Sequence, residues 1–353
     1  MVEKIAVVGE MNDSIEKRRN GTERPTLRTI ANLTGLAVTT VSRALNDAPD
    51  IGQATKERVR SVAKEVGYRP NRAGVRLRTG KTNVISLVLS SEEHMVNHTA
   101  QLVYSISDTL RGTPYHMIVT PYSPEDDPME AIRYIVETGS ADGVIINQIK
   151  PQDERVKYML DHDFPFATHG RTDAGWSHPY FDFDNTAFGE LALQSLAAKG
   201  RKKVVLIAPP FNQNYARHMI DGMHSAAAAT DVHVELLQNV FNDSSFSSLE
   251  VEIKRVMSQG SPPDGFICSS TTAAMASVAA IETCGFSLGV DVDVVGKEAV
   301  PFLGYFRRNI IIVREDVRQA GAFLAEALMR RIRSPQEPPM MDIECPKVAE
   351  TLE

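Results

Sequence analysis

Several patterns that would assign a function directly are missing from this chain of 353 residues. No apolar run approaches the ~20 residues that a membrane-spanning helix needs. The first residues lack the basic start, sustained apolar stretch and cleavage site of a secretion signal. The three cysteines, Cys268, Cys284 and Cys345, lie far apart and form no C-x-x-C pair, so neither a disulfide framework nor a zinc knuckle is indicated. We therefore expect a protein of the reducing cytoplasm.

The motifs of common enzymes are also missing. The chain contains no G-x-S-x-G, G-x-x-x-x-G-K-[ST], H-E-x-x-H or G-x-G-x-x-G sequence. These motifs carry a nucleophile, a phosphate-binding loop, a zinc site and a dinucleotide-binding turn. We therefore expect no catalytic residues, no cofactor and no metal site.

The charge is distributed unevenly along the chain. The net charge is −7, yet residues 25–82 contain 11 Lys and Arg against 4 Asp and Glu, residues 1–24 are balanced, and the remainder carries −14. A basic segment attached to an acidic body is typical of a protein that binds polyphosphate, because phosphate neutralisation supplies most sequence-independent DNA affinity. The alternative is an ordinary solvated charged face.

Residues 25–69 have the pattern of three short helices. Apolar residues recur at helical spacing over residues 27–33, 39–45 and 54–66, and Gly67 ends the third segment. The short connection Thr34-Gly35-Leu36 is of the kind that sets two helices at a steep angle. The sequence therefore predicts a helix-turn-helix.

From residue 83 onward, short β-branched runs alternate with amphipathic segments. The predicted strands are 84–89, 117–120, 143–146, 204–207, 266–268, 292–295 and 310–313, and helices such as 100–110, 129–138, 188–199, 216–229 and 273–284 separate them. This alternation predicts parallel sheets covered on both faces. About 260 residues are enough for two such sheets, with a ligand where the carboxyl ends of their strands converge.

The first helices resemble a known family. The stretch Thr26-Leu-Arg-Thr-Ile-Ala-Asn-Leu-Thr-Gly-Leu-Ala-Val-Thr-Thr-Val-Ser-Arg-Ala-Leu-Asn46, with Thr55-Lys-Glu-Arg-Val59 and Gly67-Tyr-Arg-Pro-Asn-Arg72, is similar to the headpiece of the lactose-repressor (LacI/GalR) family of bacterial transcriptional regulators. The resemblance continues more weakly to about residue 345. It implies an α/β protein with a helix-turn-helix headpiece and hinge helix, joined to a two-lobed effector domain like a periplasmic binding protein.

The domain boundaries follow from this resemblance and from the changes in pattern. We predict a flexible tail at 1–24, a DNA-binding domain at 25–69, a hinge helix or linker at 70–82, an effector-binding and dimerisation domain of two lobes at 83–345, and a second tail at 346–353.

The recognition helix supplies the candidate DNA contacts. Its first turns face base edges in the major groove, so we expect Val38 and Thr39 to contact bases and Arg43 to bind a guanine. Hydroxyl and amide groups suited to phosphates are carried by Thr40, Ser42, Asn46, Tyr68 and Asn71. The alternative for Val38 is ordinary core packing.

One position departs from the family pattern. Ala37 stands where serine is usual, which removes a cap from the recognition helix. Thr34 or Thr39 are the side chains that could compensate.

The hinge is the second candidate DNA contact. A segment of this length is marginal as an isolated helix, and Gly74 weakens it further. The resemblance implies that two hinge helices of a dimer pair in the minor groove, where each inserts Leu77 into a base step. Arg72, Arg76 and Arg78 would neutralise phosphates. The alternative is a flexible linker, which does not explain the arginines around one leucine.

The resemblance also implies which residues bind the effector. They follow predicted strands, and Arg and carboxylate groups with an aromatic face suit a sugar. The candidate residues are Asn97, His98, Arg171, Trp176, Arg217, Phe241, Thr271 and Glu298. Glu298 departs from the family's G-[FY]-D-D pattern, since the sequence reads Gly296-Lys-Glu-Ala299.

The predicted function is a cytoplasmic, nucleoid-associated repressor that binds a palindromic operator as a homodimer. The predicted effector is a neutral mono- or disaccharide, for example a glucoside such as sucrose, and it releases the DNA. Two alternatives stay open: a sugar-binding protein of the periplasmic type without DNA function, and a regulator that its effector activates as a co-repressor. The proline-rich stretch after Ile332 has no leucine heptads, which favours a dimer over a tetramer.

Overall fold

The computed structural model describes residues 25–69, 72–90, 96–123 and 125–349, and at positions 72, 73, 75, 78, 96 and 97 it describes the backbone only. The chain divides into two compact units, Met1–Thr82 and Asn83–Glu353. Within the described ranges, no helix has the length and apolar character that would let it span a membrane.

The first unit is built from three short helices around a small core. They are α2 (Leu27–Thr34), α3 (Val38–Leu45) and α4 (Gln53–Glu65), each within one residue of the predicted ranges at both ends. Ile30, Val41 and Val59, one from each helix, are fully buried. Gly35 ends α2 with a φ of 67°, a left-handed conformation that allows the sharp turn into α3. A fourth helix, α5 (Arg72–Thr79), follows.

The start of α3 has no side-chain cap. Ala37 occupies the N-cap position and accepts no hydrogen bond through its side chain. The Thr34 hydroxyl donates instead to the Ile30 carbonyl oxygen of its own helix, at 2.7 Å. The expectation that Thr34 could replace the missing cap is therefore wrong, because its hydroxyl is already used within α2.

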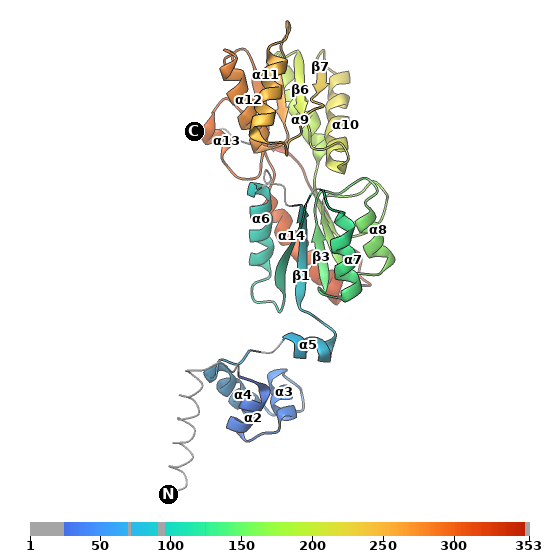
Figure 1. Ribbon diagram of the computed structural model, residues 1–353, viewed down its shortest axis with the longest axis vertical. Coiled ribbons are helices and arrows are strands. Elements are labelled where there is room, and N and C mark those ends of the chain that lie inside the picture. The colour runs from blue at the N-terminus through green and yellow to red at the C-terminus, as the bar shows by residue number, and fades with distance from the viewer. Residues whose placement is uncertain (1–24, 70–71, 91–95, 124, 350–353) are drawn as a thin grey trace. The chain divides into compact units, whose positions relative to one another are not determined.

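The second unit contains two lobes, each a sheet between two layers of helices (Figure 1). The first lobe has the strand order β11-β5-β4-β3-β1-β2, and all of its neighbouring strands are parallel. Its strands are β1 (Val84–Ser90), β2 (His116–Tyr122), β3 (Gly143–Ile146), β4 (Phe166–His169), β5 (Tyr180–Phe183) and β11 (Met341–Glu344). Its helices are α6 (Val96–Thr109), α7 (Pro128–Thr138), α8 (Glu154–Asp161) and α14 (Val317–Arg333).

Alternation along β1 places helices on both faces of this sheet. Ile85 and Leu87 pack in a cluster with residues of α6 and α14, whereas Val84 and Val88 pack with residues of α7 and α8. Both sets are buried, because successive side chains of a strand point to opposite faces. A strand buried on both faces therefore appears in the sequence as an almost unbroken apolar run.

The second lobe repeats this arrangement with the order β12-β10-β9-β8-β6-β7. Its strands are β6 (Lys203–Ile207), β7 (His233–Leu236), β8 (Gly265–Cys268), β9 (Asp293–Glu298), β10 (Ile311–Arg314) and β12 (Lys347–Val348), of which β12 alone pairs antiparallel. Its helices are α9 (Asn185–Ala198), α10 (Asn214–Ala228), α11 (Phe246–Met257), α12 (Thr271–Thr283) and α13 (Leu303–Phe306). The α/β class and the two parallel sheets agree with the prediction.

The chain passes three times between the lobes. The crossings lie between β5 and α9, between β10 and α14, and between β11 and β12. As a result α14, late in the sequence, packs in the first lobe against α6 (Figure 1). The sequence pattern predicted neither α14 nor the strands β4, β5, β7, β11 and β12.

Two glycines allow α9 and α10 to approach closely. A Cβ atom on Gly222 of α10 would lie 2.0 Å from the carbonyl oxygen of Thr186, and one on Gly189 of α9 would lie 2.2 Å from the carbonyl oxygen of Met219. Both obstacles are backbone atoms, which cannot rotate away. The helices therefore require glycine at these positions.

We expect Gly222→Ala to lower the free energy of unfolding by about 1–3 kcal/mol, because the added methyl group must push the helices apart. Urea unfolding followed by circular dichroism measures this change. Gly260→Ala is the matched control, since a Cβ there meets no atom within 4 Å. Equal stability of the two variants would contradict the close-packing argument.

Candidate nucleic-acid interface and ligand cavity

The amino-terminal end of α3 presents an exposed surface. Val38 is 42% exposed and is not part of the headpiece core, whereas Val41 and Ala44 of the same helix are buried. Thr39, Arg43 and Asn46 are exposed, and Thr40 and Ser42 are half-buried. The packing alternative for Val38 does not describe this structure, and its contact with a base stays a prediction.

Arg43 already has an intramolecular partner. Its Nη2 atom lies 2.6 Å from Oδ1 of Asp50, and both side chains are about half exposed. An exposed pair of this kind contributes about 0–1 kcal/mol. The guanidinium can therefore leave Asp50 for a base or phosphate at small cost.

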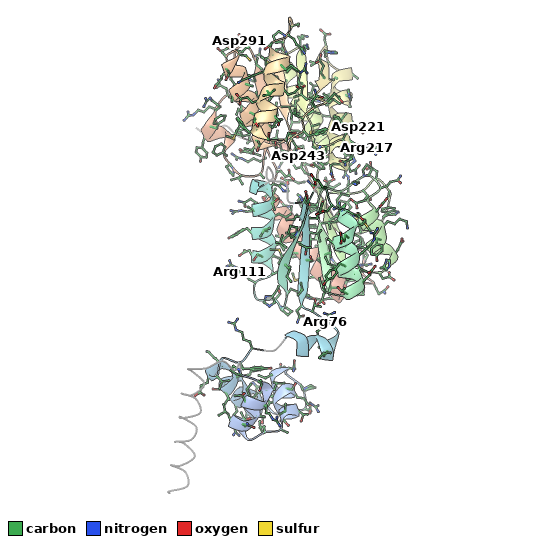
Figure 2. All side chains as sticks on the ribbon, viewed as in Figure 1. Arg76, Arg111, Arg217, Asp221, Asp243 and Asp291 are labelled. Carbon is green, nitrogen blue, oxygen red and sulfur yellow. The ribbon has the colours of Figure 1, made fainter. Side chains whose placement is uncertain are left out.

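The remaining predicted DNA contacts lie near the end of the first unit. Tyr68 is half-buried against the headpiece core, and burial raises the pKa of its phenol. Leu77 on α5 is 90% exposed, and Arg76 is exposed as well (Figure 2). Asn71 and the side chain of Arg72 lie outside the described residues.

A cavity of about 930 Å³, counting the part open to solvent, lies in the second unit. Its lining comes mainly from loops after the parallel strands of both sheets. The lining residues are His98, Asn147, Gln148, His169, Gly170, Asp182, Phe183, Asn185, Tyr215, Asn242, Ser269, Ser270, Thr271, Thr272, Lys297, Glu298, Ala299 and Glu315.

Three of the predicted effector residues line this cavity: His98, Thr271 and Glu298. Both carboxylate oxygens of Glu298 are already engaged. Oε1 lies 3.0 Å from Arg314 Nε, and Oε2 accepts backbone N–H bonds from Phe302 and Leu303 at 3.0 and 2.8 Å. Glu298 therefore holds α13 and β10 in place at the edge of the cavity. The side chain of Asn97 lies outside the described residues.

The two aromatic side chains predicted to cover a sugar, Trp176 and Phe241, lie outside the cavity lining. Trp176 packs against the core of the first lobe, and Phe241 makes an edge-on contact with Phe211 at 5.1 Å between ring centroids. Neither is among the lining residues, where the aromatic rings are Phe183 and Tyr215. Phe183 ends strand β5, which the sequence pattern did not predict.

Two predicted arginines also lie outside the lining, and both are paired. Arg171 Nε is 3.3 Å from Oδ2 of Asp182, which does line the cavity, so Arg171 acts on the site through this carboxylate. Arg217 Nη1 is 3.6 Å from Oδ2 of Asp173, and its side chain is 55% exposed. Figure 2 labels Arg217 near the junction of the two lobes.

Asp173 joins the lobes. Asn214 of α10 donates through Nδ2 to the Arg171 carbonyl oxygen at 2.8 Å and to Asp173 Oδ1 at 2.9 Å. His218 Nε2 of the same helix lies 3.1 Å from Asp173 Oδ1. The first turns of α10, in the second lobe, are thus fixed to a loop of the first.

Three amide oxygens in the cavity lining have no hydrogen-bond partner among the described residues. They are the buried Oδ1 atoms of Asn147, Asn185 and Asn242. A buried acceptor without a partner costs about 1–3 kcal/mol. The site therefore favours a ligand that brings several hydrogen-bond donors.

The sequence contains a signal for several polar residues of the cavity lining. Asn147 directly follows β3, and Ser269 and Ser270 directly follow β8. Polar side chains at the carboxyl ends of parallel strands are placed at the ligand-binding edge of the sheet.

Burial controls the charges around the cavity. It raises the pKa of Asp182 to about 7, despite Arg171, and it lowers the pKa of His169 to about 3. Burial also raises the pKa of Glu315. Lys297 and the two nearby imidazoles outweigh this effect, so the Glu315 pKa lies well below its usual value. Lys297 Nζ lies 2.7 Å from Glu315 Oε2. At neutral pH Glu315 is therefore ionised and His169 is neutral.

We expect Asp182 to make the folded protein less stable as the pH rises from about 4 to about 7. The unfolded carboxyl ionises near 3.8, whereas the folded one keeps its proton to about 7 among Arg171, Glu315 and Lys297. A difference of about 3 pKa units corresponds to at most about 4 kcal/mol. Asp182→Asn removes this contribution, so urea unfolding at about pH 5 and about pH 8 should show a smaller loss than in the unmodified protein. Asp231→Asn, at a 98% exposed side chain, is the control. An unchanged pH dependence in Asp182→Asn would contradict the buried-acid argument.

Comparisons with known proteins agree with this architecture. Residues 26–71 match the family model "Bacterial regulatory proteins, lacI family", and residues 193–350 match "Periplasmic binding protein-like domain". HTH-type transcriptional regulator RafR of Escherichia coli is 31% identical over 281 residues, covering 79% of this chain and 81% of RafR. HTH-type transcriptional regulator AglR of Rhizobium meliloti is 29% identical over 327 residues, covering 90% of each chain.

Two solved structures share the fold. The Lac repressor dimer bound to operator and the anti-inducer ONPF has a TM-score of 0.80 at 19% identity, over 93% of this chain and 98% of the repressor chain. A CelR–cellobiose complex has a TM-score of 0.67 at 22% identity, over 93% of this chain and 99% of CelR. A helix-turn-helix unit followed by two parallel-sheet lobes, together with these relatives, identifies a transcriptional regulator and excludes an enzyme. The chain belongs to the LacI family of bacterial regulatory proteins.

Proposed function

We propose that this regulator is a repressor that binds a pseudo-palindromic operator as a homodimer and is released by a small neutral carbohydrate. The observation that carries the proposal is the pairing of two features in one chain. A helix-turn-helix leaves the start of α3 exposed, and a two-lobed unit holds a cavity with unpartnered acceptor oxygens.

The exposed end of α3 supports the DNA-binding scheme. In this scheme Val38 and Thr39 contact base edges, Val38 through a thymine methyl group, and Arg43 leaves Asp50 for a guanine. The phosphate contacts of the proposal are made by Thr40, Ser42, Asn46, Tyr68, Asn71 and Arg72.

The properties of helix α5 support a hinge that folds only on DNA. Helix α5 has eight residues, fewer than the ~12 needed for stability alone, and it exposes Leu77 almost completely. A leucine in water gains from insertion between bases, where it kinks the duplex. In the proposal, α5 is stable only when two copies meet in the minor groove.

Apolar residues at one edge of the first lobe support the dimer. Strand β2 is the last strand of its sheet, and Ile118 and Val119 on it are 48% and 42% exposed. Tyr104 of α6 in the same lobe is 53% exposed. Exposed apolar side chains at a sheet edge are unfavourable in water, and a second copy would cover them.

The cavity supports a neutral carbohydrate as the effector. The unpartnered oxygens of Asn147, Asn185 and Asn242 accept from sugar hydroxyls, and the Phe183 ring offers an apolar face to C–H groups. The carboxylates in the described lining outnumber the single ammonium group of Lys297, which disfavours an anionic ligand. One protein of this fold was solved with cellobiose, and we favour a mono- or disaccharide such as a glucoside.

The bonds between the lobes support the switch. An effector held by both lobes adds to the link between Asp173 and α10, and so stabilises one arrangement of the lobes. In the proposal this arrangement separates the two hinges of the dimer, so that α5 unfolds and the operator is released. The coupling is reciprocal: DNA weakens effector binding by the same factor.

We expect Leu77→Ser to reduce operator affinity by tenfold or more, about 1.4 kcal/mol, because a polar side chain does not stabilise the kinked base step. The operator is obtained by repeated selection from random duplexes, and affinity is measured by fluorescence anisotropy. Val290→Ser, at a 72% exposed valine of the second unit, is the control and should bind normally. Undiminished binding by Leu77→Ser, or a selected site without two-fold symmetry, would overturn the hinge and dimer scheme.

The effector is tested by a thermal-shift screen of neutral mono- and disaccharides on the full chain. We expect at least one sugar to raise Tm and to weaken binding of the selected operator. Asn242→Ala should reduce the Tm shift because it removes an acceptor, whereas Gln238→Ala, which is exposed and outside the cavity, should not. A sugar that raises Tm without changing operator affinity would refute the switch, and one that strengthens operator binding would make the protein a co-repressed regulator.

A further inference from the structure

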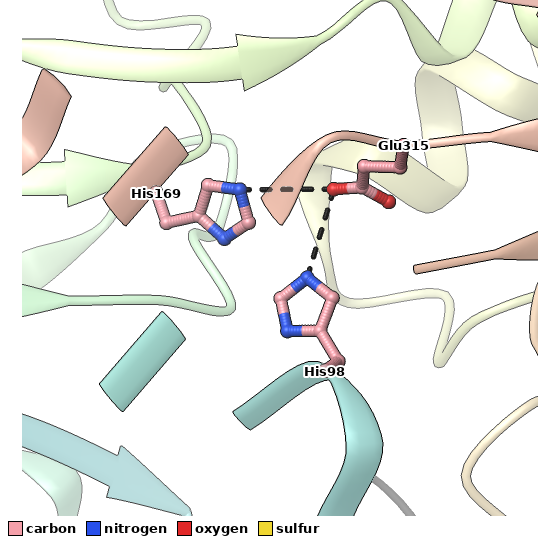
Figure 3. A group of neighbouring side chains, drawn as sticks. All are labelled: His98, His169 and Glu315. Carbon is pink, nitrogen blue, oxygen red and sulfur yellow. Dashed lines mark ion pairs between the residues drawn. The ribbon is translucent and has the colours of Figure 1, made fainter. Parts of the chain in front are cut away.

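Three potential metal ligands from distant parts of the sequence converge at one side of the cavity. His98 is near the start of α6, His169 ends β4, and Glu315 directly follows β10. Their nearest ligand atoms all lie within 4.8 Å of one another (Figure 3). The side chains of His169 and Glu315 are 9% and 7% exposed, and that of His98 is 19% exposed.

Hydrogen bonding does not explain this convergence. Both imidazole Nε2 atoms point toward the same oxygen, Glu315 Oε1, at 3.6 Å from His98 and 3.7 Å from His169 (Figure 3). These distances exceed the 2.7–3.2 Å of a normal N–H···O bond. Buried polar atoms that face one another beyond hydrogen-bonding distance leave room for a bound species between them.

We propose that His98, His169 and Glu315 bind one divalent transition-metal ion of the Zn²⁺ type. Two imidazoles and one carboxylate form an established donor set for zinc. With bonds of ~2.0–2.1 Å, ligand atoms of a tetrahedral ion are about 3.3 Å apart. The two observed nitrogen–oxygen distances exceed this value by only a few tenths of an ångström, and the imidazoles need to approach each other further.

Lys297 positions the carboxylate ligand. Its Nζ lies 2.7 Å from Glu315 Oε2, on the oxygen that does not face the imidazoles. A hydrogen bond to the second oxygen leaves Oε1 as a monodentate ligand, as outer partners of metal ligands commonly do. The ammonium charge also repels a cation, so Lys297 sets the orientation of Glu315 at some cost in affinity.

All three ligands line the cavity, so the fourth position of a tetrahedral ion would face the space where an effector binds. Water or an effector hydroxyl would occupy it. Metal binding itself does not depend on the proposed function and is measured without DNA or sugar.

The test uses the full chain, stripped of metal with a chelator and dialysed. Zn²⁺ bound per chain is measured by inductively coupled plasma mass spectrometry, and Co²⁺ is titrated while its visible absorption is recorded. We expect one ion per chain and the strong visible bands of a tetrahedral site. His169→Gln and Glu315→Gln should each weaken binding at least about tenfold, since loss of even an outer partner costs about 10–100-fold.

His218→Gln is the matched control, because His218 also faces a carboxylate, Asp173, but does not line the cavity. This variant should bind metal normally. Circular dichroism of each variant verifies folding.

The proposal fails if the stripped chain takes up no ion, or if His169→Gln and Glu315→Gln bind as tightly as His218→Gln does. None of these results would alter the assignment of the operator or of a sugar effector.

Discussion

The buried pair of Lys297 and Glu315 is the interaction on which the cavity depends. Lys297 belongs to β9 of the second lobe, and Glu315 lies where the chain leaves β10 for the first lobe. Their 2.7 Å contact keeps Glu315 ionised in a buried position, facing two histidines of the first lobe. Removing one partner of such a pair is strongly destabilising, by about 3–5 kcal/mol, because the other charge stays buried. The Lys297–Glu315 contact therefore fixes a charge in the cavity and also the segment that crosses from β10 to the first lobe.

The three chain crossings are consistent with the switch proposed for this junction. Each lobe has its own hydrophobic core, so each can move as a rigid body. Crossing segments and a few polar contacts, such as those of Asp173 with α10, connect them. A ligand that contacts both lobes needs to alter only these contacts to favour one arrangement, and a population shift requires no more than such a difference in affinity.

The first unit is built differently from the two lobes. Its core is small, the recognition surface is a single exposed helix end, and α5 exposes its one leucine. Low intrinsic stability suits the proposed role of α5, because the ordering of such an element can depend on a partner and be withdrawn. Arg43, a DNA contact in the proposed scheme, is paired with Asp50 on the exposed surface of this unit.

The sequence alone determined the local elements. The spacing of apolar residues predicted the bounds of the three headpiece helices to within one residue. It predicted the bounds of fully buried strands such as β1 and β3 to within one or two residues, because a strand buried on both faces is an apolar run. The family resemblance gave His98, Thr271 and Glu298 as effector residues, and all three line the cavity. Trp176 and Phe241, proposed as the aromatic face, lie outside the lining, because an aromatic ring has the same sequence pattern in a core as in a cavity.

Only the tertiary structure decided which distant residues meet. The convergence of His98, His169 and Glu315, the engagement of both oxygens of Glu298, and the pairing of Arg171 with Asp182 depend on the lobe crossings and on burial. The physical reason is that the spacing of residue types along the sequence gives information only about neighbours within one helix or strand. Contacts and charges between elements follow from packing of the whole chain.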